Sequence, residues 1–265
     1  MASSRPAQAS KHEYERRRSH RLRRWLDRLL PPVCVVCGDP LARRDGRVCG
    51  LCWSRSRRQR QPQCMRCGIS LQDIGIAASG SSCIECEDWL PYLRQARAPF
   101  VMAGNAARIV HALKYGGWSE LADEMGTQMG RLRFSPDVET ELAGVLPVPL
   151  SRARARERGY NQAELLAKAV AEVRRLPLLT GVLQRHRHTQ RQARLSPPER
   201  QTNVSRAFKV DSERRACIDG QHLLLVDDVL TTAATIKDCV PALCSSGARA
   251  VSVVTFARAR RELPS

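Results

Sequence analysis

The stretch LLLVDDVLTTAATI, residues 223–236, decides the fold class of this chain. Its first four residues form a continuous apolar run, which is typical of a strand that is buried on both faces of a parallel sheet. Two acidic residues follow, and then a threonine-rich turn that opens a helix expected over residues 232–245. The stretch therefore predicts a strand, a turn and a helix, which is the repeating unit of α/β proteins.

The turn between this strand and this helix combines two kinds of polar group. A helix N-terminus offers unpaired N–H groups and a positive dipole end, which hold a phosphate, and threonine hydroxyls at 231, 232 and 235 add donors. The carboxylates of Asp227 and Asp228 can accept hydrogen bonds from vicinal hydroxyls, at the sheet edge where α/β proteins bind ligands. The pattern fits a ribose 5-phosphate; the alternative is a helix stabilised at its N-terminus by acids.

The same alternation of strands and helices extends over the second half of the chain. Helical spacing of apolar residues predicts helices over 106–115, 121–132 and 161–173. Apolar runs predict further buried strands over 144–150 and 250–256. We therefore expect an α/β domain over residues 97–265, with a parallel sheet and helices on both of its faces.

Eight of the eleven cysteines lie in four Cys-x-x-Cys pairs, whose members are Cys34, Cys37, Cys49, Cys52, Cys64, Cys67, Cys83 and Cys86. Each pair supplies two corners of a tetrahedral zinc site, and four sulfur ligands leave no open position, so two structural zinc ions are expected. Disulfides are the weaker alternative, because the sequence shows no export signal and the cytoplasm keeps thiols reduced. Consecutive and cross-braced pairing both remain open, although the short first spacing favours consecutive pairing.

Composition and charge narrow the class of protein further. The chain carries 44 Lys and Arg against 26 Asp and Glu, a net charge of +18, which favours partners that carry phosphates. A basic but functionally indifferent surface is the alternative.

A hydrophobic content of 43% excludes a wholly disordered chain, and no apolar run approaches the roughly 20 residues of a membrane span. The arginine-rich residues 1–24 lack the apolar core of a secretory signal and are expected to form a disordered basic arm, so the cytoplasm is the expected compartment.

Several motifs, taken together, resemble known proteins. The stretch around Asp227 resembles the ribose-phosphate-binding motif of type I phosphoribosyltransferases, which bind 5-phosphoribosyl 1-pyrophosphate (PRPP). Three further segments and the four cysteine pairs resemble the ComF family and follow one another in the same order along the chain. The segments are HALKY (111–115), PVPLSRARARERGYNQ (147–162) and LQRHRHTQRQARLSPPERQTNVSRAF (183–208). This resemblance spans about residues 25–258. It implies a double zinc ribbon over residues 25–96, followed by a type I phosphoribosyltransferase-like α/β domain.

The resemblance also implies roles for individual residues. Asp227 and Asp228 would bind the ribose hydroxyls, and Mg²⁺ would bridge ribose and pyrophosphate oxygens. The 5-phosphate would lie on the turn formed by Thr231, Thr232, Ala233, Ala234 and Thr235. Residues 186–202 would form a hood over the site. The pyrophosphate would lie near four basic residues, which are Lys114, Arg154, Arg158 and Arg200.

Two positions depart from the motif. Ala233 stands where the motif usually has glycine, so a positive φ at this position would cost about 1 kcal/mol or more and crowd the phosphate, whereas a helical φ would make alanine harmless. Thr231 stands where the 6-oxopurine transferases carry an acidic base, which argues against a hypoxanthine or guanine acceptor.

Three functions fit this sequence. The ComF resemblance implies a role in DNA uptake during natural transformation, with single-stranded DNA and competence proteins as partners. The alternatives are a PRPP-dependent transferase with an unidentified acceptor and a non-catalytic PRPP-sensing regulator. Because aromatic residues make up only 5% of the chain, backbone electrostatics would dominate any binding of single strands, and that binding would depend steeply on salt.

Overall fold

The computed structural model describes residues 32–41, 46–74, 83–185 and 207–260. The chain divides into two compact units, residues 1–53 and residues 54–265. The smaller unit contains the first four cysteines and most of helix α2 (Gly50–Ser54). Everything described below, apart from the first cysteine group, belongs to the larger unit.

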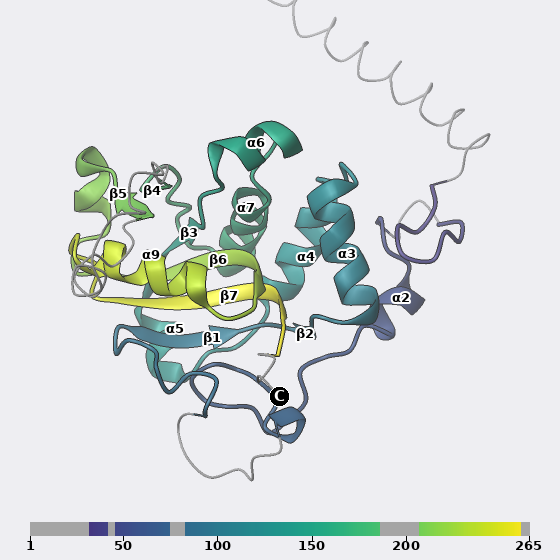
Figure 1. Ribbon diagram of the computed structural model, residues 1–265, viewed down its shortest axis with the longest axis horizontal. Helices are drawn as coiled ribbons and strands as arrows, with labels where there is room; N and C mark the ends of the chain where they lie inside the picture. Colours follow the sequence, from purple (N-terminus) through teal and green to yellow (C-terminus); the bar gives the residue numbers. More distant parts are fainter. Residues whose placement is uncertain (1–31, 42–45, 75–82, 186–206, 261–265) are drawn as a thin grey trace, which may run out of the picture. The chain divides into compact units, whose positions relative to one another are not determined.

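A parallel sheet forms the centre of the larger unit (Figure 1). Its strands lie in the order β1 (Leu93–Arg97), β7 (Ala250–Arg258), β6 (His222–Leu230) and β3 (Leu142–Pro147), and the short β2 (Phe100–Val101) pairs with the end of β7. Every pairing in this sheet is parallel. Strand β7 is buried at each of its residues, as the mainly apolar run over residues 250–256 predicts. The predicted parallel α/β fold is therefore confirmed.

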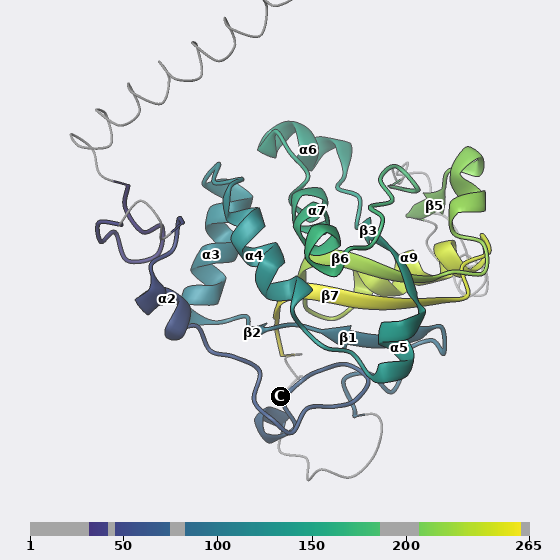
Figure 2. The same cartoon turned by 180° about the vertical axis from the view of Figure 1, so that it is seen from behind.

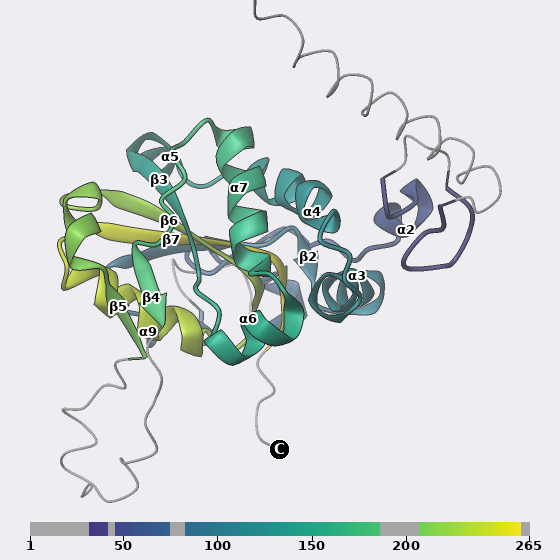
Figure 3. The same ribbon diagram turned by 90° about the horizontal axis from the view of Figure 1, so that it is seen from above.

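Helices cover both faces of the sheet, as expected (Figure 3). Helices α4 (Leu121–Gly130) and α7 (Gln162–Arg174) lie together on one face, which Figure 2 shows from behind. Their contact is close at Gly126, where an added Cβ would come within 2.4 Å of the Ala169 Cβ. Helix α9 (Ala234–Cys244) covers the opposite face, where Ile236, Val240 and Leu243 pack against strands β6 and β7.

The remaining elements connect or flank this framework. They are α3 (Gly104–Tyr115), α5 (Pro136–Glu141), α6 (Arg152–Arg158), the antiparallel pair β4 (Leu183–Arg185) and β5 (Phe208–Val210), and the 3-10 helices η1 (Gln72–Ile74) and η3 (Ser212–Cys217). Among the described residues, no helix is long and apolar enough to cross a bilayer.

The predicted elements are present, but three of their ends need correction. The strand expected over 223–226 continues through the acid pair to Leu230, because Asp227, Val229 and Leu230 still pair with β7. The strand expected over 144–150 ends at Pro147, where its pairing with β6 stops. The helix expected from Thr232 begins at Ala234. The acid pair therefore lies inside the last part of a strand, not after it.

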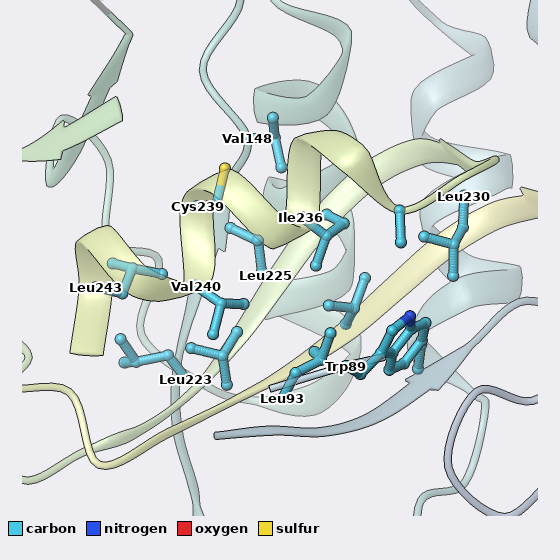
Figure 4. Close-up of a cluster of buried hydrophobic side chains, with 14 of the residues drawn as sticks. Trp89, Leu93, Val148, Leu223, Leu225, Leu230, Ile236, Cys239, Val240 and Leu243 are labelled. Carbon is cyan, nitrogen blue, oxygen red and sulfur yellow. The ribbon is translucent and has the colours of Figure 1, made fainter. Parts of the chain in front are cut away.

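The second cysteine group is part of the core of the larger unit. Cys64, Cys67, Cys83 and Cys86 are 6% exposed or less and belong to the same buried cluster as strand β6 and helix α9. Figure 4 shows Trp89, which follows this group, close to Leu230 and below Ile236. The second cysteine group therefore belongs to the larger unit, residues 54–265, where it packs against the sheet.

Candidate functional site

The eight cysteines of the pairs form two separate groups of sulfur atoms. The groups are Cys34, Cys37, Cys49, Cys52 and Cys64, Cys67, Cys83, Cys86, and within each the sulfurs lie within 4.8 Å of one another. Sulfurs bound 2.3 Å from a tetrahedral zinc ion stand about 3.8 Å apart. The Cys64–Cys86 and Cys67–Cys83 sulfurs are separated by 3.7 and 3.5 Å, so the donor set fits zinc. Pairing is consecutive, and the cross-braced alternative is excluded.

The first centre is prepared for a metal by its own backbone. The Cys34 sulfur accepts the N–H groups of Val36 and Cys49, each at 3.4 Å. Although burial opposes ionisation of this thiol, these N–H donors lower the pKa of Cys34 to about 6. A thiolate at neutral pH is the form that binds zinc.

The second centre is enclosed by arginine side chains. The Arg66 guanidinium donates to the carbonyls of Cys86, Trp89 and Leu90 at 3.3, 2.9 and 2.7 Å, which ties the last knuckle to the chain that leads into β1. Arg258, at the end of β7, is 2% exposed, and its guanidinium lies 3.7 Å from the Glu85 carboxylate, which neighbours Cys86. A zinc ion with four thiolates carries a net charge of −2, so buried cations nearby offset the cost of burying it.

The acid pair at the end of β6 faces in two directions, because successive side chains of a strand alternate. Asp228 is 4% exposed, and its Oδ2 lies 2.9 Å from the Lys114 ammonium of α3. The same oxygen accepts a hydrogen bond of 3.2 Å from the Gln162 side chain at the start of α7. Strand β3 ends opposite Val226, and this early end leaves the Asp228 side open to both helices.

Asp227 lies on the opposite face of the strand, toward α9. Its Oδ1 accepts the backbone N–H of Asp228 at 2.8 Å, and within the part of the chain that the structure describes it forms no ion pair. Burial, followed by the negative charge of Asp228, raises the pKa of the Asp227 carboxyl to about 7. Asp228 is thus paired with a cation, whereas Asp227 has no cation partner among the described residues and has a raised pKa.

The turn after β6 leads directly into α9. Thr231, Thr232 and Ala234 are exposed, and Thr235 is half-buried in the first turn of the helix. Ala233 precedes the helix with φ 61° and ψ 9°, the left-handed conformation, while its methyl group is buried at 5% exposure. Ala233 therefore has the positive φ that is strained for alanine, and this conformation costs about 1 kcal/mol of folding free energy.

Aromatic side chains connect α3 with the segment that follows α6. The Arg158 guanidinium lies 5.0 Å from the centre of the Tyr115 ring and donates to the Tyr115 hydroxyl at 3.3 Å. The Tyr160 hydroxyl donates to the carbonyl of Leu113. Arg154 is exposed on α6, whose first turn is capped by Ser151. Together with Lys114, these contacts hold the end of α3 beside the acid pair.

Most of the expected site residues lie close together, some lie outside the described residues, and three further residues of the site were not expected. The structure brings Lys114, Asp227, Asp228 and the turn of residues 231–235 together at one edge of the sheet, with Arg158 on Tyr115. Arg200 and the hood expected over 186–202 lie outside the described residues. Sequence reasoning missed Gln162, Tyr115 and Tyr160 as parts of the site, although all three stand inside the motifs HALKY and RGYNQ.

The structure combines two tetrathiolate centres with a parallel α/β domain. An acid pair lies at the end of a strand of this domain, just before the turn into α9. Residues 25–87 match the family described as the double zinc ribbon domain. The chain is 27% identical over 232 residues to the DNA utilization protein YhgH of Escherichia coli (strain K12), covering 86% of this chain and 98% of that protein. It is 25% identical over 241 residues to the competence protein ComFC of Bacillus subtilis (strain 168), covering 84% and 93%.

Other relatives match over shorter stretches. Competence protein F of Haemophilus influenzae is 34% identical over 115 residues, which are 43% of this chain and 50% of that protein. These homologues confirm the resemblance to the ComF family. Among solved structures, the glutamine PRPP amidotransferase from B. subtilis in complex with ADP and GMP matches with a TM-score of 0.36 and 20% identity, over 50% of this chain and 25% of that one.

Proposed function

We propose that this protein binds PRPP with Mg²⁺ at the carboxyl end of β6 and handles single-stranded DNA during DNA uptake. The observation that carries the first part is the acid pair beside the turn of residues 231–235, held at one sheet edge by α3, α7 and α9. Ligands of open α/β sheets bind at this edge. The names of the relatives, competence proteins and DNA utilization proteins, support the second part.

Each part of PRPP meets a matching group in this arrangement. The exposed Thr231 and Thr232 and the N–H groups at the start of α9 supply donors for the 5-phosphate. The carboxylates of Asp227 and Asp228 accept hydrogen bonds from the ribose hydroxyls. Lys114 and Arg158 supply positive charge for the pyrophosphate, and the exposed Arg154 lies on the same segment as Arg158.

A divalent cation fits the same edge. Asp227 has no ion pair in the described part of the chain, and its pKa is raised to about 7, so a cation that arrives with the ligand would stabilise its ionised form. Mg²⁺ prefers carboxylate and phosphate oxygens, and when bound it would neutralise the pyrophosphate. If turnover occurs, Lys114 and Arg158 would stabilise the leaving pyrophosphate by charge, and no protein nucleophile is required.

The DNA-handling part rests on charge as well as on the relatives. A net charge of +18 attracts phosphodiester strands, and the low aromatic content favours contacts with the backbone over stacking on bases. Competence proteins are the partners that such a role implies, and the cytoplasm is the compartment in which we expect it.

The first test is a calorimetric titration of PRPP with Mg²⁺ into the zinc-loaded protein. We expect binding in the micromolar range that Asp227→Ala abolishes. Ribose 5-phosphate is the matched ligand, because it shares the ribose and the 5-phosphate but lacks the pyrophosphate, and we expect it to bind at least tenfold more weakly. Absence of heat with PRPP in the wild-type protein would refute the proposal. Release of pyrophosphate with an acceptor would distinguish a transferase from a PRPP sensor.

A further inference from the structure

Two adjoining cavities lie away from the PRPP site, within the larger unit. Each has a volume of about 500 Å³. The Arg131 cavity lies between the ends of α4 and α7, and the Arg97 cavity lies between the segments 58–65, 97–99 and 132–136. Leu132 and Arg133 line both cavities, so the two adjoin, and we call them together the arginine trough. It shares no lining residue with the acid pair or the turn after β6.

The trough carries more positive than negative charge, although the −2 charge of the second zinc centre reaches the Arg97 cavity through Cys64. Arg58, Arg97 and Arg133 line the Arg97 cavity, whose described lining contains no acidic residue. Arg131 and Arg133 line the other cavity together with Arg174 and Glu139. The only acid in the described lining is already neutralised, because Glu139 lies 2.8 Å from the Arg174 guanidinium. The trough thus offers a net positive charge to a ligand.

The arginines at the base of the trough are held rigidly. The Arg97 guanidinium donates to the carbonyls of Ala96 and Met65 at 2.8 and 2.9 Å and lies 5.7 Å from the Phe134 ring centre. Arg174 lies 5.1 Å from the same ring. Arg131 and Arg133, in contrast, are exposed. The bonded Arg97 and Arg174 and the exposed Arg131 and Arg133 together suit an anionic ligand that lies along the surface.

We propose that the arginine trough binds the phosphates of a single-stranded nucleic acid. The inference rests on the proposed DNA handling and names the surface that performs it. A single cavity of this volume accommodates one small ligand. Two adjoining cavities, with Arg133 in the lining of both, match a chain of successive phosphates. The exposed Met65 and Gln61 at the border of the Arg97 cavity offer an apolar and an amide contact to sugars and bases.

The test compares two double variants with equal loss of charge. The trough variant is Arg131→Glu with Arg133→Glu. The matched control is Lys168→Glu with Arg214→Glu, two exposed positions outside both cavities. Full-length, zinc-loaded proteins are titrated into fluorescein-labelled dT20 at several salt concentrations and followed by fluorescence anisotropy. Thermal unfolding and PRPP titration of each variant establish that the fold and the PRPP site are intact.

We expect the trough variant to bind dT20 at least tenfold more weakly than the wild type. We also expect the slope of log affinity against log salt to fall by about 1.4, since each phosphate contact contributes about 0.7 for single strands. The control should stay within twofold of the wild type. Thymidine 5′-monophosphate should compete poorly, because it supplies one phosphate. Equal weakening of both variants, wild-type affinity of the trough variant, or efficient competition by the mononucleotide would each overturn the proposal. If the wild type itself fails to bind dT20, the proposed DNA handling fails with it, whereas PRPP binding is judged separately.

Discussion

The ammonium of Lys114 lies 2.9 Å from the carboxylate of Asp228, and this contact joins helix α3 to the end of strand β6. The carboxylate is nearly buried, with a side-chain exposure of 6%, and Gln162 is its second partner. The resemblance to the ComF family implies that Lys114 lies near a pyrophosphate. In the structure, Lys114 forms an ion pair with Asp228, one of the two acids that we propose to bind the ribose. The same ammonium would therefore contact both Asp228 and the pyrophosphate.

Removing this cation should therefore affect stability as well as binding. We expect Lys114→Gln to lower the free energy of unfolding by about 1–3 kcal/mol, because it leaves a buried carboxylate without its cation. In urea unfolding, the double variant Lys114→Gln with Asp228→Asn should recover part of that loss. A double variant whose loss equals the sum of the two single losses would show that the two groups do not interact in solution.

Replacement of Ala233 tests the strain in the turn. Because its φ is 61°, we expect Ala233→Gly to raise the free energy of unfolding by about 0.5–1 kcal/mol, the cost of the left-handed conformation less the entropy that glycine adds to the unfolded chain. The control is Ala234→Gly, at the first residue of the helix with an ordinary helical backbone, which should be destabilising by about 0.5 kcal/mol. Equal destabilisation by both glycines would contradict a left-handed Ala233.

The two zinc centres should differ in how much of the protein depends on them. Cys67 is 1% exposed in the main core, whereas Cys37 is exposed in the smaller unit. We expect Cys67→Ser to lower the free energy of unfolding of the larger unit by about 3–5 kcal/mol, and Cys37→Ser to leave it nearly unchanged. Each variant should bind one zinc ion in place of two, as measured by atomic emission spectroscopy. An equal effect of both variants on the larger unit would contradict this division.

The raised pKa of Asp227 predicts a pH dependence with a definite sign. An acid whose pKa is higher in the folded state than in the unfolded one reduces stability as pH rises from about 4, its unfolded value, to about 7, its folded value. Relative to the wild type, Asp227→Asn should thus gain stability between pH 5 and pH 8 in urea unfolding. The same substitution at the exposed Asp123 serves as the control. A gain that is equal at both pH values would contradict the shift.

Much of the fold could be predicted because it depends on local pattern. The apolar run before Asp227 and the cysteine spacing are properties of neighbouring residues, and they predicted the parallel strand and the metal ligands. The choice between consecutive and cross-braced pairing depends on how distant knuckles meet, which spacing alone did not decide. The same holds for the packing of Trp89 and the second cysteine group against β6 and α9.

The rest of the site and the trough depend on contacts between distant segments. Gln162 and Tyr160 look like ordinary helix-start residues until Gln162 is placed beside Asp228 of β6 and Tyr160 beside the end of α3. The arginines of the trough come from four separate segments, and in a chain rich in arginine none of them stands out. Tertiary packing, and not local propensity, brings them together.

Above all, we propose that the carboxyl end of β6 binds a ribose phosphate. A crystal structure of the zinc-loaded protein with PRPP and Mg²⁺ would show whether it does. We predict the 5-phosphate on the N–H groups and hydroxyls of residues 231–235, and the ribose hydroxyls within hydrogen-bond distance of Asp227 and Asp228. Ligand density in the arginine trough, with the turn after β6 left empty at saturating PRPP, would contradict the account.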